Sequence, residues 1–228
     1  SVALYGVSDQ PTSVEALVAK YDRALSSSYR EEHLDAAVRF EQLVAEVRSA
    51  LPEDHPRAIQ ICCDAAVAFM RTDRLDGAES LLRWIIGKAE RVPPASDWWI
   101  TVSRMNLAQC LARSGRASEG VALLDETIAG LGPAPKQPWV RATLRGIRAD
   151  ALASDVSLGP ARFAAAAGEI EASIKDLERH PRPDALSQDQ TMAQLCGTAS
   201  TIYERWAAEG GPSDAVQRAA AWKNRAES

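Results

Sequence analysis

Small and bulky residues recur in this chain at an interval of 42 residues, and this repeat limits the fold more than any single motif does. Three columns share the interval: Ala24, Ala66 and Ala108; Ala36, Ala78 and Gly120; Phe40, Leu82 and Leu124. Within a unit the two small residues lie 12 apart, which places them on successive helices whose backbones approach closely. The unit is therefore predicted to be a helix hairpin. One hairpin cannot bury its apolar face alone, so we expect an all-α solenoid of stacked hairpins.

Turn residues divide the chain into about five such hairpins. Glycine or proline clusters follow the apolar helical stripes, for example Pro93-Pro94, Gly115, Gly132-Pro133 and Gly210-Gly211-Pro212. Helices are expected over 13–27, 31–50, 57–71, 75–91, 97–114 and 117–130, then two from Pro138 onward, a long one ending near 209 and a short last one. Residues 1–12 are expected to be a lead-in segment. Residues 13–228 are expected to form one domain with units of about 13–52, 53–95, 96–135, 136–182 and 183–228.

Composition narrows the class of protein. Of 228 residues, 46% are hydrophobic and 25% charged, and no stretch approaches the roughly 20 apolar residues of a membrane span. The net charge of -5 argues against a general nucleic-acid binder, because such domains usually carry a basic excess. The N-terminus lacks a basic stretch followed by an apolar one, so no signal peptide is expected. A cytoplasmic protein without membrane or nucleic-acid partners is predicted.

The four cysteines do not form a metal-binding pattern. Cys62 and Cys63 are adjacent in a helical stretch, so their side chains point about 100° apart. Neither Cys110 nor Cys196 has a second Cys or His at ligand spacing. We expect buried free thiols in a reducing compartment, with no metal and no cofactor.

The third unit carries a family resemblance. Asn106-Leu107-Ala108, Leu111, Gly115-Arg116, Gly120 and Leu123-Leu124 resemble the tetratricopeptide repeat (TPR), in the long variant of about 42 residues found in kinesin light chains and bacterial signalling proteins. The match is strongest over 51–130 and weakens on both sides. The resemblance implies a right-handed superhelix whose first helices line a concave groove for peptides or partner segments.

Carrying the groove positions of the family over to this chain gives a set of candidate partner-binding residues. They are Tyr21, Asp22, Leu25, Cys63, Asp64, Val67, Met70, Met105, Asn106, Gln109 and Arg113. Asp22, Asp64 and Asn106 lie 42 apart, where relatives use asparagine to hold a peptide backbone. A carboxylate can accept but not donate, so this column favours a partner with basic or donor-rich groups.

Arg141, Arg145 and Arg148 share a helix face because they are four and three residues apart. One interpretation is an anion-binding subsite, since guanidinium groups are always charged and donate in a plane. The other is a solvated face, or pairing with acidic residues of a neighbouring helix.

The sequence contains no phosphate-binding loop, nucleophile elbow or His pair at metal spacing. We therefore expect no enzyme activity, and a protein- or peptide-binding or sensing module of a bacterial regulatory protein. One alternative is a structural scaffold that fills its groove with a second copy, as a homodimer. The other is the sensor half of a switch enzyme whose catalytic domain lies outside these residues.

Overall fold

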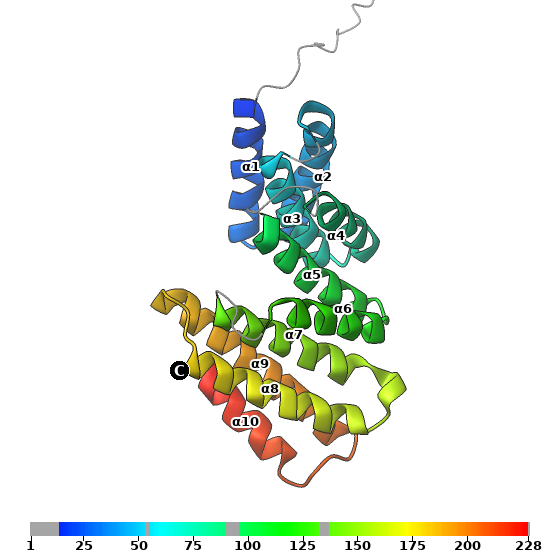
Figure 1. Ribbon diagram of the computed structural model, residues 1–228, viewed down its shortest axis with the longest axis vertical. Helices are drawn as coiled ribbons and strands as arrows, with labels where there is room; N and C mark the ends of the chain where they lie inside the picture. The colour runs from blue at the N-terminus through cyan, green and yellow to red at the C-terminus, as the bar shows by residue number, and fades with distance from the viewer. Residues whose placement is uncertain (1–13, 53–54, 90–95, 133–136, 228) are drawn as a thin grey trace, which may run out of the picture. The chain divides into compact units, whose positions relative to one another are not determined.

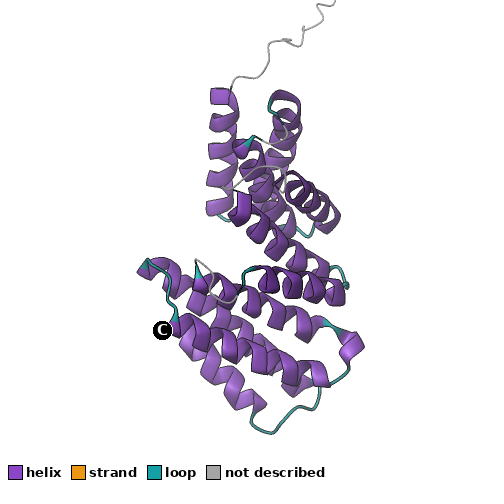
Figure 2. Ribbon diagram, in the orientation of Figure 1, coloured by secondary structure: helices purple, strands orange, loops and turns teal. Residues whose placement is uncertain are grey.

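The computed structural model describes residues 14–52, 55–89, 96–132 and 137–227. These residues form helices joined by turns and contain no strand (Figures 1 and 2). The helices are α1 (Val14–Tyr29), α2 (His33–Ala50), α3 (Pro56–Arg71), α4 (Leu75–Ala89), α5 (Ser96–Arg113), α6 (Ala117–Gly130), α7 (Pro138–Ser154), a short 3-10 helix η1 (Val156–Leu158), α8 (Ala161–Arg179), α9 (Ala185–Ala208) and α10 (Ala215–Ala226). None of these described helices is both long and apolar enough to cross a membrane.

Local chemistry explains where several helices begin. Pro56 is the first residue of α3, where its missing N–H costs no hydrogen bond, and the His55 ring accepts a hydrogen bond from the Arg57 N–H at 3.1 Å. In α9 the carboxylate of Asp184 accepts from the Ser187 N–H at 2.7 Å. The expected lead-in segment, residues 1–12, lies outside the described residues.

The turn inside each of the first three hairpins uses the same left-handed backbone conformation. Glu31, Asp73 and Gly115 have φ angles of 61°, 60° and 78°. These positions are again 42 residues apart, so the interval extends to the turn. Glycine adopts this conformation without steric cost, as expected at Gly115. Glu31 and Asp73 carry side chains there, which is uncommon for residues other than glycine.

Contacts divide the chain into two compact units, 1–103 and 104–228, and the boundary falls within α5. In the first unit, α1 packs on α2, α2 on α3 and α3 on α4, while α1 also meets α3. In the second, α6 packs on α7, α7 on α8, α8 on α9 and α9 on α10, and α7 also contacts α9. Within each unit these consecutive helices contact one another along the chain, as in a helical solenoid. That all five pairs form a single domain stays a prediction.

The residues of the repeat lie where the interval predicts. Ala24, Ala66, Ala108, Ala36, Ala78, Phe40, Leu82 and Leu124 are each at most 1% exposed. At Gly120 an added Cβ would lie 2.8 Å from the carbonyl oxygen of Ala108, so the backbones of α5 and α6 touch at this point. The expectation that small residues mark close helix approaches is confirmed at Gly120 and Ala108.

The C-terminal part departs from the strict interval. In α7 the close approach falls at Gly146, where an added Cβ would lie 2.2 Å from a methyl group of Leu195 in α9. The 3-10 helix Val156–Leu158 between α7 and α8 was not expected. Asp155 stabilises it, since its carboxylate accepts from the Ser157 N–H at 3.1 Å and the Ser118 hydroxyl at 2.6 Å.

We predict that Gly120→Ala lowers the free energy of unfolding by about 1–3 kcal/mol, because the new methyl group meets backbone atoms that cannot rotate away. Gly168→Ala is the matched control. Gly168 is exposed in α8 with no atom near its absent Cβ, so alanine there should be neutral or should stabilise by up to about 1 kcal/mol. Denaturant unfolding of both variants measures the difference, and equal stability would contradict the close approach.

Candidate functional site

A chain of polar groups joins α1 to α3 in the first unit. Arg57 donates to the Gln60 side-chain oxygen at 2.9 Å, and the Gln60 amide donates to the Tyr21 hydroxyl at 3.0 Å. That hydroxyl donates in turn to a carboxylate oxygen of Asp64 at 2.6 Å. Each of these groups donates a hydrogen bond to the next, so the chain of hydrogen bonds fixes the orientation of the Asp64 carboxylate.

Burial governs the acid–base behaviour of this pair. Tyr21 is buried, and desolvation together with the hydrogen bond to Asp64 raises its pKa well above the ordinary value. Desolvation also raises the pKa of the Asp64 carboxyl, while the hydrogen bond from Tyr21 acts in the opposite direction. Asp64 is only partly buried, and an ionised carboxylate has acceptor capacity beyond the one bond from Tyr21.

The structure separates the candidate groove residues of the first unit by exposure. Asp22 is exposed, and Leu25 and Val67 are partly exposed, so these three can contact a partner. Cys63 and Met70 are only 3% and 6% exposed, and they serve mainly as core. Neighbouring positions such as Cys63 and Asp64 point about 100° apart, so one can be buried while the next is accessible, and the family pattern alone does not show which.

The remaining groove candidates, on α5, fall in the second unit. Met105, Asn106 and Gln109 are partly exposed, whereas Arg113 is exposed. Met105 also packs against the buried core of this unit, which includes Ala108 and Leu124. Because these residues belong to the other compact unit, a binding surface shared with α1 and α3 stays a prediction.

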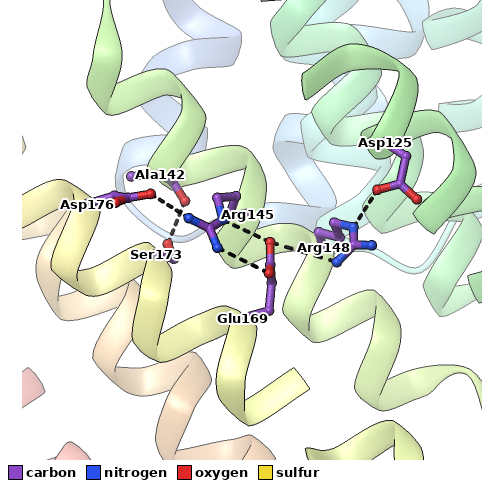
Figure 3. Close-up of polar contacts among 7 residues, drawn as sticks. All are labelled: Asp125, Ala142, Arg145, Arg148, Glu169, Ser173 and Asp176. Atoms are coloured by element: carbon purple, nitrogen blue, oxygen red, sulfur yellow. Dashed lines mark hydrogen bonds and ion pairs between the residues drawn. The ribbon is translucent and has the colours of Figure 1, made fainter. Parts of the chain in front are cut away.

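The three arginines of α7 are held by other groups of the second unit, and Figure 3 shows two of them, Arg145 and Arg148. Arg145 contacts the Glu169 carboxylate at 3.0 Å and that of Asp176 at 2.5 Å, both on α8. Arg148 contacts Asp125 of α6 at 2.6 Å. Arg141 donates to the carbonyl of Gly132.

Glu169 also lies 3.8 Å from Arg148, so one carboxylate links two of the guanidinium groups. This arrangement ties α6, α7 and α8 together by charge. An anion binding at Arg145 or Arg148 would compete with carboxylates already in place, and anion binding there stays a prediction.

All four cysteines are buried and free, as expected for structural thiols. Burial raises the pKa of Cys62 and Cys63 to about 12, which keeps both thiols protonated and unreactive. Within the described part of the chain, no group of three His, Cys, Asp or Glu side chains is arranged to hold a metal ion.

Sequence reasoning missed a hollow of about 430 Å³ beside the turn between α1 and α2. Ser28, Tyr29, Glu31, His33 and the last residue of α3, Arg71, line it. The Arg71 guanidinium donates to the Ser28 hydroxyl at 3.2 Å and so joins the two helix ends. Tyr29 and Arg71 are 42 residues apart and follow the repeat, whereas no sequence pattern distinguishes Ser28, Glu31 and His33.

Solved structures with the same fold place the chain in a structural class. No family model matches it, and no curated protein matches it significantly. A Podospora anserina protein described as a kinesin light chain with nearly identical TPR-like repeats is 17% identical, with a TM-score of 0.61 over 94% of this chain and 97% of that one. Bacillus thuringiensis PlcR, solved in complex with the peptide PapR7 and DNA, is 13% identical, with a TM-score of 0.61 over 98% of this chain and 74% of that one. The chain therefore has the TPR-type helical solenoid fold, as its repeat resemblance implied.

We predict that Tyr21→Phe destabilises the protein by about 1–2 kcal/mol, because Gln60 and the partly buried Asp64 each lose a hydrogen-bond partner. Tyr29→Phe, on the same helix, is the control: Tyr29 is 82% exposed, so removal of its hydroxyl should have no effect. Urea unfolding of the two variants tests this, and equal midpoints would show that the Tyr21 bond adds nothing to stability.

The raised pKa of Asp64 predicts a pH-dependent effect of Asp64→Asn. The folded protein holds this proton more tightly than the unfolded chain, so the carboxylate costs stability as pH rises through its pKa. Asparagine keeps an acceptor for Tyr21 and carries no charge. Relative to wild type, the variant should therefore gain stability between about pH 3 and about pH 7. Unfolding free energies at both pH values measure the change, and a relative loss at the higher pH would contradict it.

Proposed function

We propose that this chain is a non-catalytic protein- or peptide-binding module whose partner lies along α1 and α3. The observation that carries the proposal is the combination on this face of exposed Asp22, partly exposed Leu25 and Val67, and a carboxylate at Asp64 held in place by Tyr21. Apolar side chains supply contact area, and oriented acceptors supply specificity.

The chemistry of this face favours a basic or donor-rich partner. When Asp22 and Asp64 are ionised, their carboxylates accept hydrogen bonds and cannot donate them. A lysine, an arginine or an unpaired peptide N–H is therefore the complementary group. PlcR, which has the same fold, was solved with a bound peptide, and this supports a peptide as the partner class.

We further propose a regulatory role in the bacterial cytoplasm. Arginine supplies most of the positive charge and alanine is abundant, a composition typical of GC-rich bacterial genes. The free buried thiols suit a reducing compartment. The Arg141, Arg145 and Arg148 face is a secondary candidate, for an anionic group that displaces its carboxylate partners.

A structural scaffold whose groove is filled by a second copy of the chain is the second candidate function. The observation in its favour is the set of large apolar side chains exposed on the end hairpin, Tyr29, Leu34 and Val38. A mass in solution of one chain at high protein concentration would exclude it. A catalytic domain adjoining these residues would instead make the chain a sensor half, which the flanking gene sequence decides.

We predict that Asp22→Asn weakens binding of a basic partner and reduces its salt dependence, since one attractive charge is lost. The purified chain is first used to isolate a partner, whose binding segment is then synthesised and titrated at two salt concentrations. Asp76→Asn removes the same charge from α4, outside the proposed face, and should leave affinity unchanged. Equal affinity of the wild type and the Asp22 variant would exclude this face as the site.

A further inference from the structure

The hollow beside the α1–α2 turn contains charged groups that the protein leaves without a charged partner. In the described part of the chain, the Arg71 guanidinium has one hydrogen bond, to the neutral Ser28 hydroxyl, and no carboxylate partner. The Glu31 side chain has no ion pair or hydrogen bond within the same part of the chain. Both line the same hollow, yet they do not pair with each other.

Neighbouring residues show that this turn can pair charges where the geometry allows it. Arg30 and Glu32, which flank Glu31, form an ion pair at 3.0 Å. The turn therefore brings one pair of opposite charges into contact, whereas Glu31 of the turn and Arg71 at the end of α3 form no ion pair. A cation and an anion held apart at one hollow match a ligand that carries both charges.

One further observation concerns the rim of the hollow. Tyr29 exposes 82% of its surface at the rim, where its ring offers an apolar and aromatic contact.

We propose that this hollow binds a small zwitterion of the α-amino acid class. Its carboxylate accepts hydrogen bonds from Arg71 and Ser28, its ammonium group pairs with Glu31, and its side chain lies against the Tyr29 ring. A volume of about 430 Å³ leaves room for a free amino acid with an aromatic or branched side chain. This site lies at the ends of α1 and α3, the helices of the proposed peptide-binding face, and its ligand class goes beyond that proposal.

The test is calorimetric or NMR titration of the purified chain with free aromatic and branched amino acids, each compared with its N-acetyl and its carboxamide form. Loss of either ligand charge should weaken binding about tenfold, as should Arg71→Gln or Glu31→Gln. Arg30→Gln and Glu32→Gln are the matched controls, in the same turn and with the same charge changes, and should bind like wild type. Thermal melts of all four variants confirm that they are folded.

Three results would overturn the proposal: no amino acid binds at up to about 10 mM, well above the weakest affinity that such a site should give; the N-acetyl or carboxamide forms bind as tightly as the free ones; or the control variants lose as much affinity as the variants of Arg71 and Glu31. Asp22→Asn should leave amino acid binding unchanged. The outcome for the hollow is thereby separated from the outcome for the peptide-binding face.

Discussion

The close packing of two helices at small, buried residues is the constraint on which the rest of this structure depends. At Gly120 the α6 backbone touches the Ala108 carbonyl, which leaves no room for a side chain. Only small residues permit such contact, and the bulky residue one turn later, such as Leu124, then fills the space beside it. The third hairpin brings its two helices close together for this reason.

Much of the fold could be predicted because this constraint appears in the sequence at a fixed interval. The columns that begin at Ala24 and Ala36 located the first three hairpins, and most helix ends lie within two residues of their expected positions. The interval fails after α6, because Gly146 and Leu195 replace the earlier pattern of contacts. The 3-10 helix after α7 is capped by Asp155, whose carboxylate also accepts from Ser118, a partner far away in sequence that no local pattern contains.

The candidate sites were less predictable than the fold, because exposure and pairing depend on tertiary neighbours. Family positions identified Asp22 and Asp64, but not that Tyr21 occupies one Asp64 oxygen. Helical spacing placed Arg145 and Arg148 on one face, yet only the structure shows that Glu169 lies between them. The hollow at Arg71 combines residues from two helix ends and a turn, and sequence spacing does not show that Arg71 and Glu31 lack an ion-pair partner there among the described residues.

The shared turn conformation of Glu31, Asp73 and Gly115 has a consequence for how such a chain can evolve. In the first three hairpins the residue at this position projects from the turn and contributes nothing to the buried columns. The cost of a side chain there is local backbone strain, which does not spread into the interior. Mutation can therefore vary charge and size at these three points independently of one another, while the helix contacts that define the repeat stay fixed.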